Sequence, residues 1–120
     1  MVENYRDLVV WQRAMELAEA TYAVTRIFPK DEQFGMTSQA RRAAASVAAN
    51  IAEGYGRGTR PAYINHLRIA QGSLKELETH LMLATRVGLC EPSVANAAME
   101  LADEVARMLR ALLAKLSARS

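Results

Sequence analysis

The sequence is poor in the residues that interrupt helices or staple small folds. Among its 120 residues there are three prolines, six glycines and one cysteine, Cys90. A single cysteine excludes an intrachain disulfide, and no basic residue lies within three positions of it to activate the thiol. Sparse proline and glycine, beside abundant alanine, leucine, glutamate and arginine, favour helix over strand. A chain of this length buries enough surface to fold as one domain without a structural metal.

Long apolar runs are missing as well. Residues 1–13 place charges on both sides of a short apolar run. This segment therefore lacks the apolar core, roughly 7–15 residues long, of a secretory signal. No run approaches the roughly 20 apolar residues that cross a bilayer. We therefore expect a cytoplasmic protein that does not associate with membranes.

Acidic residues are scarce in the middle of the chain, although the whole chain has a net charge of only +2. Between residues 34 and 75 one acid, Glu53, accompanies six bases, which are Arg41, Arg42, Arg57, Arg60, Arg68 and Lys75. The local net charge of +5 suits a polyanion, and these six residues are the candidate nucleic-acid contacts. The alternative is that they scatter over the surface. The basic end of the last predicted helix matches the helix dipole, so we give it little functional weight.

Apolar residues recur at spacings of three and four along most of the chain, which is the period of a helix packed on one face. The pattern predicts four helices, at about residues 7–27, 37–53, 61–87 and 93–118. The second is rich in alanine, whose small side chain lets neighbouring helices approach closely. Short breaks make consecutive helices antiparallel neighbours. We therefore predict an all-α protein, a single up-down-up-down four-helix bundle over residues 1–120.

The predicted helix ends carry local signals. Thr37 or Ser38, Thr59 and Ser93 are expected N-caps of the last three helices, because their side chains can accept a hydrogen bond from a free backbone amide. Gly88 stands where a left-handed residue would end the third helix.

The segment NIAEGYGRGT, residues 50–59, contains three glycines and raises the question of a phosphate-binding loop. A Walker-type loop needs a lysine and a preceding strand, and a dinucleotide-binding turn needs a different glycine spacing. This segment follows a predicted helix and has neither feature. We interpret it as the turn between two helices, in which Gly54 takes the left-handed conformation that ends the second helix.

No combination of residues predicts an enzyme, a metal site or a cofactor site. His66 and His80 are 14 residues apart on the predicted third helix, hence about 21 Å along its axis, and cannot share an ion within one chain. The glutamates near His80 lack the Glu-x-x-His spacing of di-iron bundles. No Ser-His-Asp or Cys-His set can be assembled. We therefore expect a protein that is not an enzyme and holds no cofactor or metal.

Polar residues within apolar helix faces form a second set of candidates, which are Asn50, Glu53, Ser73 and Glu76. Each pair lies three residues apart on one predicted helix. Buried polar groups are nearly always hydrogen-bonded. We therefore predict a structural network across helices, with Arg41 or Arg42 as the partner of a carboxylate. The alternative is that the carboxylates face water.

The apolar surface exceeds what one bundle needs. Additional apolar residues flank the main stripe of the third helix (Ile69, Met82, Leu83 and Val87) and that of the first (Trp11, Met15 and Tyr22). Exposed apolar patches mark partner surfaces, and self-association is the simplest explanation.

Three segments resemble a known family over about residues 7–116. They are DLVVWQRAMELA, FPKDEQFGMTSQARRAAASVAANIAEGYGR and YINHLRIAQGSLKELETHL. The family is usually called four helix bundle protein, and its members are encoded in intervening sequences of bacterial large-subunit ribosomal RNA genes and elsewhere in bacterial chromosomes. The resemblance implies an antiparallel bundle that assembles as a homopentamer with a central channel, and it supplies no enzymatic activity. A related branch is similar to the accessory variability proteins of diversity-generating retroelements, which are basic pentamers that bind nucleic acid and a reverse transcriptase.

Two functions remain open. In the first, a homo-oligomer contacts the phosphates of RNA or DNA through a basic rim, without base specificity. In the second, the protein is a protein-interaction or structural assembly module with no nucleic-acid role. Its arginines then serve solubility and ion pairs between subunits.

Overall fold

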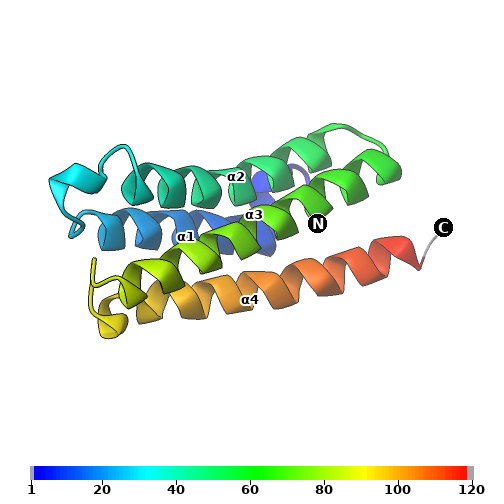
Figure 1. Ribbon diagram of the computed structural model, residues 1–120. Coiled ribbons are helices and arrows are strands. Elements are labelled where there is room, and N and C mark those ends of the chain that lie inside the picture. The colour runs from blue at the N-terminus through cyan, green and yellow to red at the C-terminus, as the bar shows by residue number, and fades with distance from the viewer. Residues whose placement is uncertain (1, 119–120) are drawn as a thin grey trace.

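The computed structural model of the chain describes residues 2–118 and consists of helices joined by short loops (Figure 1). The helices are α1 (Val9–Thr25), α2 (Met36–Gly56), α3 (Arg60–Arg86) and α4 (Pro92–Ser117), with 3-10 turns η1 (Tyr5–Asp7) and η2 (Lys30–Glu32). Successive helices run in opposite directions, so α1 begins and α4 ends toward the same side of the bundle. Each helix packs on two neighbours, α1 and α3 both contacting α2 and α4. No strand occurs in residues 2–118, so the predicted all-α, up-down-up-down bundle is confirmed.

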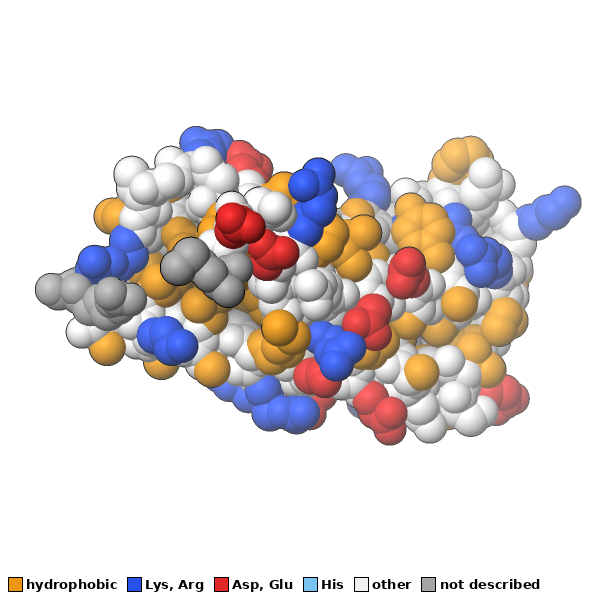
Figure 2. Space-filling model, turned by 180° about the vertical axis from the view of Figure 1, so that it is seen from behind, with side chains coloured by type: hydrophobic (Ala, Val, Ile, Leu, Met, Phe, Trp, Pro, Cys, Tyr) orange, Lys and Arg blue, Asp and Glu red, His pale blue; other side chains and the backbone are white. Residues whose placement is uncertain are grey.

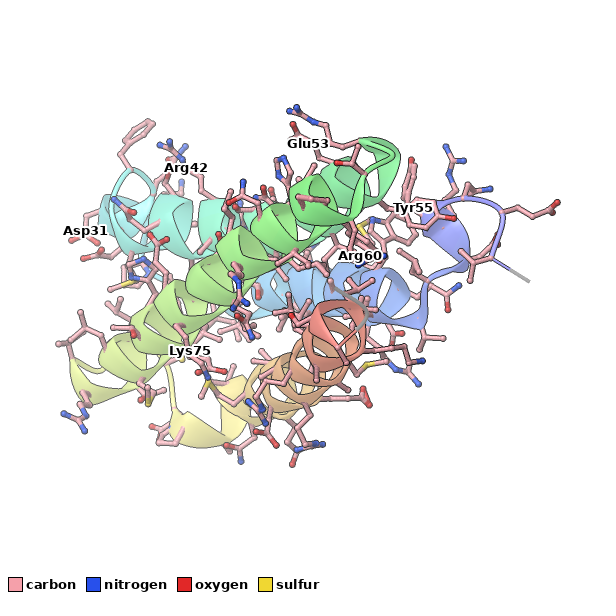
Figure 3. All side chains as sticks on the ribbon, turned by 90° about the vertical axis from the view of Figure 1, so that its right-hand side faces the viewer. Asp31, Arg42, Glu53, Tyr55, Arg60 and Lys75 are labelled. Carbon is pink, nitrogen blue, oxygen red and sulfur yellow. The ribbon has the colours of Figure 1, made fainter. Side chains whose placement is uncertain are left out.

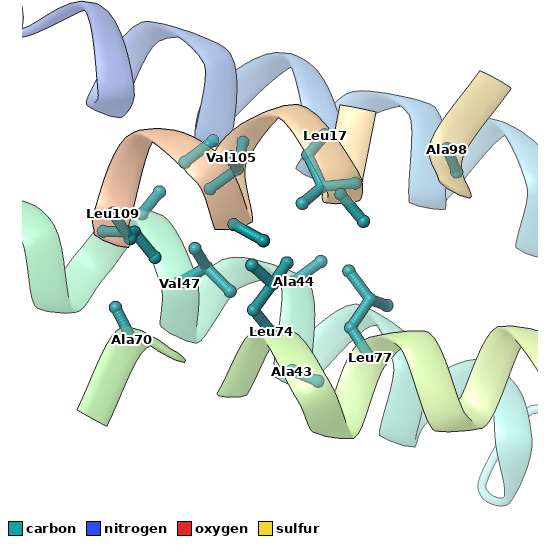
Figure 4. Packing of buried hydrophobic residues seen from close by; sticks show 14 of the residues in the cluster. Leu17, Ala43, Ala44, Val47, Ala70, Leu74, Leu77, Ala98, Val105 and Leu109 are labelled. Carbon is teal, nitrogen blue, oxygen red and sulfur yellow. The ribbon is translucent and has the colours of Figure 1, made fainter. Parts of the chain in front are cut away.

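The core is one apolar column along the bundle, to which all four helices contribute (Figure 4). Its largest fully buried apolar side chains are Leu17, Val47, Ile51, Leu67, Leu74, Leu77, Leu81, Val105 and Leu109. Each such side chain contributes roughly 1.5–3 kcal/mol by leaving water. Alanine fills half of the buried positions of helix α2, which makes its most extensive contact with α3.

Two predicted N-caps are corrected by the structure. Helix α2 begins at Met36, and Thr37 is buried within its first turn instead of capping it. The Met36 amide donates to Glu32 Oε1 at 3.0 Å, so the preceding 3-10 turn supplies the acceptor. Helix α4 begins at Pro92, which needs no amide partner, and Ser93 therefore lies inside the helix.

Other helix ends follow their local signals. Thr59 Oγ1 accepts a hydrogen bond from the Ala62 amide at 3.3 Å at the start of α3. Gly88 follows α3 with φ 81°, in the left-handed region. Helix α1 begins later than predicted, at Val9, because residues 5–7 form a separate 3-10 turn capped by Asn4.

Gly54 does not end α2, contrary to the prediction. The helix continues to Gly56, and the left-handed residue of the turn is Gly58, with φ 84°. Gly54 is buried against α3, where a Cβ would lie 2.7 Å from the Cβ of His66 and 3.3 Å from a ring carbon of Tyr63. Glycine is therefore required at this position because α3 passes so close.

Candidate nucleic-acid interface

The six basic residues predicted to contact nucleic acid do not form one patch. Arg42, Arg60 and Lys75 project from separate parts of the bundle (Figure 3). On the face shown in Figure 2, basic side chains stand apart from one another and alternate with acidic ones. Each candidate is therefore judged by its own surroundings.

Arg41 and Arg57 are engaged within the chain. Arg41 Nε donates to Thr25 Oγ1 at 2.8 Å, and its guanidinium carbon lies 4.4 Å from the centroid of the Tyr22 ring. Arg41 thus ties α2 to α1. Arg57 Nη2 donates to Glu53 Oε2 at 2.5 Å, one helical turn earlier. Its charge is locally balanced, which weakens its attraction for a phosphate.

Arg42 shares a shallow depression with an acid. The depression, about 330 Å³, is lined by Gln39, Arg42, Ala43, Ser46 and Glu76. Glu76 is also bonded to His80, with 3.4 Å between Oε2 and Nε2. No ion pair between Arg42 and Glu76 occurs in the described part of the chain. The carboxylate of Glu76 beside Arg42 disfavours the binding of a polyanion in this depression.

Arg60 begins α3 and borders a pocket of about 320 Å³ at one end of the bundle. The rings of Tyr55 and Tyr63 meet edge to face there, with 5.8 Å between centroids. The Tyr63 hydroxyl is buried without a hydrogen-bond partner among residues 2–118. Burial raises the pKa of the Tyr63 phenol, so this hydroxyl stays protonated.

Arg68 and Lys75 lie in one groove together with Arg110 of α4. The groove, about 410 Å³, runs between α3 and α4 and is completed by Gln71, Gly72, Leu74 and Ala106. Lys75 Nζ pairs with Glu78 Oε1 at 3.1 Å. Within the described residues neither Arg68 nor Arg110 has a hydrogen-bond or ion-pair partner. This groove therefore combines an excess of positive charge with space for a ligand.

Arg110 did not belong to the predicted set. Basic residues are expected in the C-terminal half of α4 because they interact favourably with the helix dipole. Their presence in the sequence therefore does not indicate a binding role. Arg110 also follows Arg68 by 42 residues. Only the packing of α4 on α3 brings the two into one groove, so no local signal could have identified it.

The predicted polar network takes a form that the sequence did not specify. Ser46 Oγ of α2 and Ser73 Oγ of α3 lie 2.8 Å apart. Asn50 Nδ2 donates to the Ser46 carbonyl at 2.9 Å and to its Oγ at 3.1 Å. Asn50 Oδ1 therefore faces His66 of α3, whose Nδ1 lies 3.1 Å away. An amide oxygen only accepts, so His66 Nδ1 is the donor.

Glu53 lies beside this chain of hydrogen bonds at the surface of the bundle, within ion-pair distance of His66. Its Oε2 lies 3.9 Å from His66 Nε2 and also accepts from Arg57. The hydrogen bond from Arg57, followed by the charge of His66, lowers the pKa of the Glu53 carboxyl. Three predicted members, Asn50, Glu53 and Ser73, thus fall on one line between α2 and α3, whereas Glu76 pairs with His80 outside it. Neither Arg41 nor Arg42 takes part, and the members that the prediction omitted are Ser46 and His66.

Exposed apolar side chains gather in the C-terminal half of α3 and directly after it. Met82 and Leu83 of the helix and Val87, which follows it, are 47%, 44% and 61% exposed. Met82 and Leu83 line a hollow of about 260 Å³ with Thr79 and Arg86. Trp11 was predicted to be one of the additional apolar residues outside the core. It instead packs against the core, partly buried, and its ring centroid lies 5.2 Å from that of Tyr5.

Residues 2–118 show neither a cluster of metal ligands nor a membrane-spanning helix. No group of three or more histidine, cysteine, aspartate or glutamate side chains there could hold an ion. None of the helices in this range is both long and apolar enough to span a bilayer.

Comparisons with known proteins place the chain in a family. A family model described as 23S rRNA-intervening sequence protein matches residues 6–111. The fold is similar to the crystal structure of a protein of unknown function from the S23 ribosomal protein family of Bacteroides thetaiotaomicron. The TM-score is 0.80 at 24% identity, covering 87% of this chain and 97% of the other. At that identity the likeness concerns the fold alone. Among functionally curated proteins no match was found.

Proposed function

The chain belongs to the 23S rRNA-intervening sequence protein family, and we propose that it is a non-enzymatic, homo-oligomeric bundle that associates with nucleic acid. The observation that carries the proposal is the groove between α3 and α4, where Arg68, Lys75 and Arg110 meet from two helices. Contacts from arginine and lysine to phosphates do not depend on base sequence. The protein would therefore bind RNA or DNA strands of many sequences, and we place this activity in the cytoplasm.

Exposed apolar side chains on α3 support the self-association that this proposal includes. The outer face of α3 is basic around Arg68 and Lys75 and apolar around Met82 and Leu83. Apolar surface of this kind is suited to a second copy of the chain, which would leave the basic half exposed. In a homopentamer, the assembly that the resemblance implies, five grooves would act on one polyanion and convert weak contacts into strong binding.

The second candidate is a protein-interaction or structural assembly module. The observation that favours it is the pairing of several bases within the chain, including Arg41 with Thr25 and Tyr22, and Arg57 with Glu53. In that case the cations of the groove serve solubility or pair with acids of another subunit.

Binding of labelled RNA and DNA at about 50 mM and 200 mM salt separates the two candidates, because phosphate contacts weaken steeply with salt. If the protein binds nucleic acid, we expect binding at the lower salt concentration and an affinity that is about 10-fold or more weaker at the higher one. No binding at the lower concentration contradicts it. Native mass spectrometry of the same sample measures assembly, and a monomer at micromolar concentration would contradict the homo-oligomer.

A further inference from the structure

Gly72 lies in the interior of α3, where glycine costs about 1 kcal/mol relative to alanine. Neither backbone conformation nor internal packing explains it. Positive φ occurs only at Gly58 and Gly88 within residues 2–118, so Gly72 has ordinary helical geometry. Apart from its chain neighbours and the backbone of its own helix, no heavy atom lies within 4 Å of the position that a Cβ on Gly72 would take. Gly54, by contrast, has its reason in the contact with α3.

The space beside Gly72 belongs to the basic groove between α3 and α4. Arg68 stands four residues before Gly72 and Lys75 three residues after it, so the three share one face of α3. The two basic residues are about 10 Å apart along the axis, at a rise of roughly 1.5 Å per residue. Arg110 faces them from α4. The missing side chain leaves the backbone of α3 bare between two cations.

The charge of the groove favours an anionic occupant. Three bases line it, and the one acid paired with them in the described part of the chain is Glu78, which contacts Lys75. The apolar members Leu74 and Ala106 are buried in the core, so the exposed lining comes mainly from Arg68, Lys75 and Arg110 with Gln71 and Gly72. A nucleic-acid strand is narrow and carries its charges at regular intervals on a sugar–phosphate backbone. Such a backbone fits a groove with cations on both sides of an open floor.

We infer that a single strand of nucleic acid lies in the α3–α4 groove, with its sugar–phosphate backbone against Gly72 and its phosphates on Arg68, Lys75 and Arg110. This inference rests on the proposed function. It adds where the strand runs, which form of nucleic acid is bound, and a role for Arg110 and Gly72.

The steric test fills the groove without changing its charge. Gly72→Leu adds a side chain into open space, so we expect it to fold, as circular dichroism would show. Binding of fluorescein-labelled oligo(U) RNA should weaken about tenfold, the factor that corresponds to about 1.4 kcal/mol. Ala97→Leu, at an exposed position of α4 away from the groove, is the matched control and should bind as the wild type does.

The charge test uses two arginines on one helix. Arg110→Gln should reduce the slope of log affinity against log salt by about 0.7 for each phosphate of a single strand that the arginine neutralises in the wild type. Arg107→Gln removes the same charge three residues earlier, where the arginine pairs with Asp103 and does not line the groove. Its slope should equal that of the wild type. This pair keeps the inference testable if Gly72→Leu does not fold.

The outcomes separate this inference from the proposed function. Absence of RNA binding by the wild type at about 50 mM salt contradicts the proposed function itself. Wild-type binding that survives in Gly72→Leu and Arg110→Gln overturns the inference alone, because the strand then lies elsewhere. A change of oligomeric state in Gly72→Leu, seen by native mass spectrometry, also overturns it by assigning the groove to a second copy of the chain. Equal binding of duplex and single strand would overturn the choice of a single strand.

Discussion

Helix α3 meets its two neighbours in opposite ways. Against α2 it is closed: a Cβ on Gly54 would lie only 2.7 Å from that of His66, and the hydrogen bonds Ser46–Ser73 and Asn50–His66 cross the contact. Against α4 it opens into a groove beside Gly72. Both contacts contain a glycine within a helix. Gly54 allows α3 to pack closely on α2, whereas Gly72 leaves space for a ligand between α3 and α4.

The two contacts of α3 also differ in whether their polar side chains have partners within the chain. On the α2 side each polar side chain of the line from Ser73 to Glu53 has a partner within the chain. On the α4 side Arg68 and Arg110 have none within the described residues. Satisfied polar groups stabilise a fold, whereas unpaired cations in a groove are available to a ligand. We therefore expect substitutions at the first contact to destabilise the fold and substitutions at the second to alter binding.

The largest expected effect on stability is at Gly54. Gly54→Ala puts a Cβ 2.7 Å from that of His66, and overpacking of this kind costs about 1–3 kcal/mol. This cost should exceed the gain in helix propensity, and urea unfolding would measure it. Gly56→Ala, two residues later on the same helix with no neighbour within 4 Å, is the control. Equal stability changes in the two variants would contradict the close contact.

Asn50 is expected to have the next largest effect. Asn50→Ala leaves His66 Nδ1 and Ser46 without their common partner, and removing the partner of part-buried groups costs about 1.5 kcal/mol. Chemical denaturation measures the change. Asn65→Ala, at an exposed position of α3, should leave stability nearly unchanged. Similar values for both asparagines would show that the polar line does not hold α2 to α3.

Gly72→Ala should stabilise the protein, which is the opposite of Gly54→Ala. The added Cβ meets no atom within 4 Å outside the neighbouring backbone of its own helix, and helix propensity improves by about 1 kcal/mol. Thermal and urea unfolding would both report it. A decrease in stability would mean that the groove is closed in solution and that the contrast between the two sides of α3 is wrong.

The smallest expected effect is the contribution of Glu53, at the solvent-exposed end of the polar line, to the pH dependence of stability. The pKa of Glu53 is lowered in the folded protein by the hydrogen bond from Arg57 and by His66. A carboxyl whose folded pKa is depressed stabilises above its unfolded pKa and loses that contribution as pH falls through the folded value. Melting curves of the wild type and Glu53→Gln should therefore differ at neutral pH and converge in acid. A constant difference across that range would contradict the coupling.

Local patterns were sufficient for the elements of this fold. The spacing of apolar residues predicted four helices because burial on one face imposes the helical period whatever the partner is. Thr59 and Gly88 marked helix ends because their caps involve only neighbouring residues. Gly54, Thr37 and Ser93 were misassigned for the complementary reason: each fits a cap locally, yet helix packing or the preceding turn decides how it is used.

The candidate site depended on contacts between segments distant in sequence. Six bases between residues 34 and 75 predicted a positive region, but packing of α2 on α1 placed Arg41 on Tyr22, and helical spacing paired Arg57 with Glu53. Packing of α4 on α3 then brought in Arg110, which no spacing rule connects to Arg68. Composition and period determine that this chain forms a bundle of four helices, because those depend on each residue and its near neighbours. The angle and distance at which the helices meet decide which glycine packs against a neighbouring helix and which arginine remains available to a ligand. Only the tertiary structure sets these.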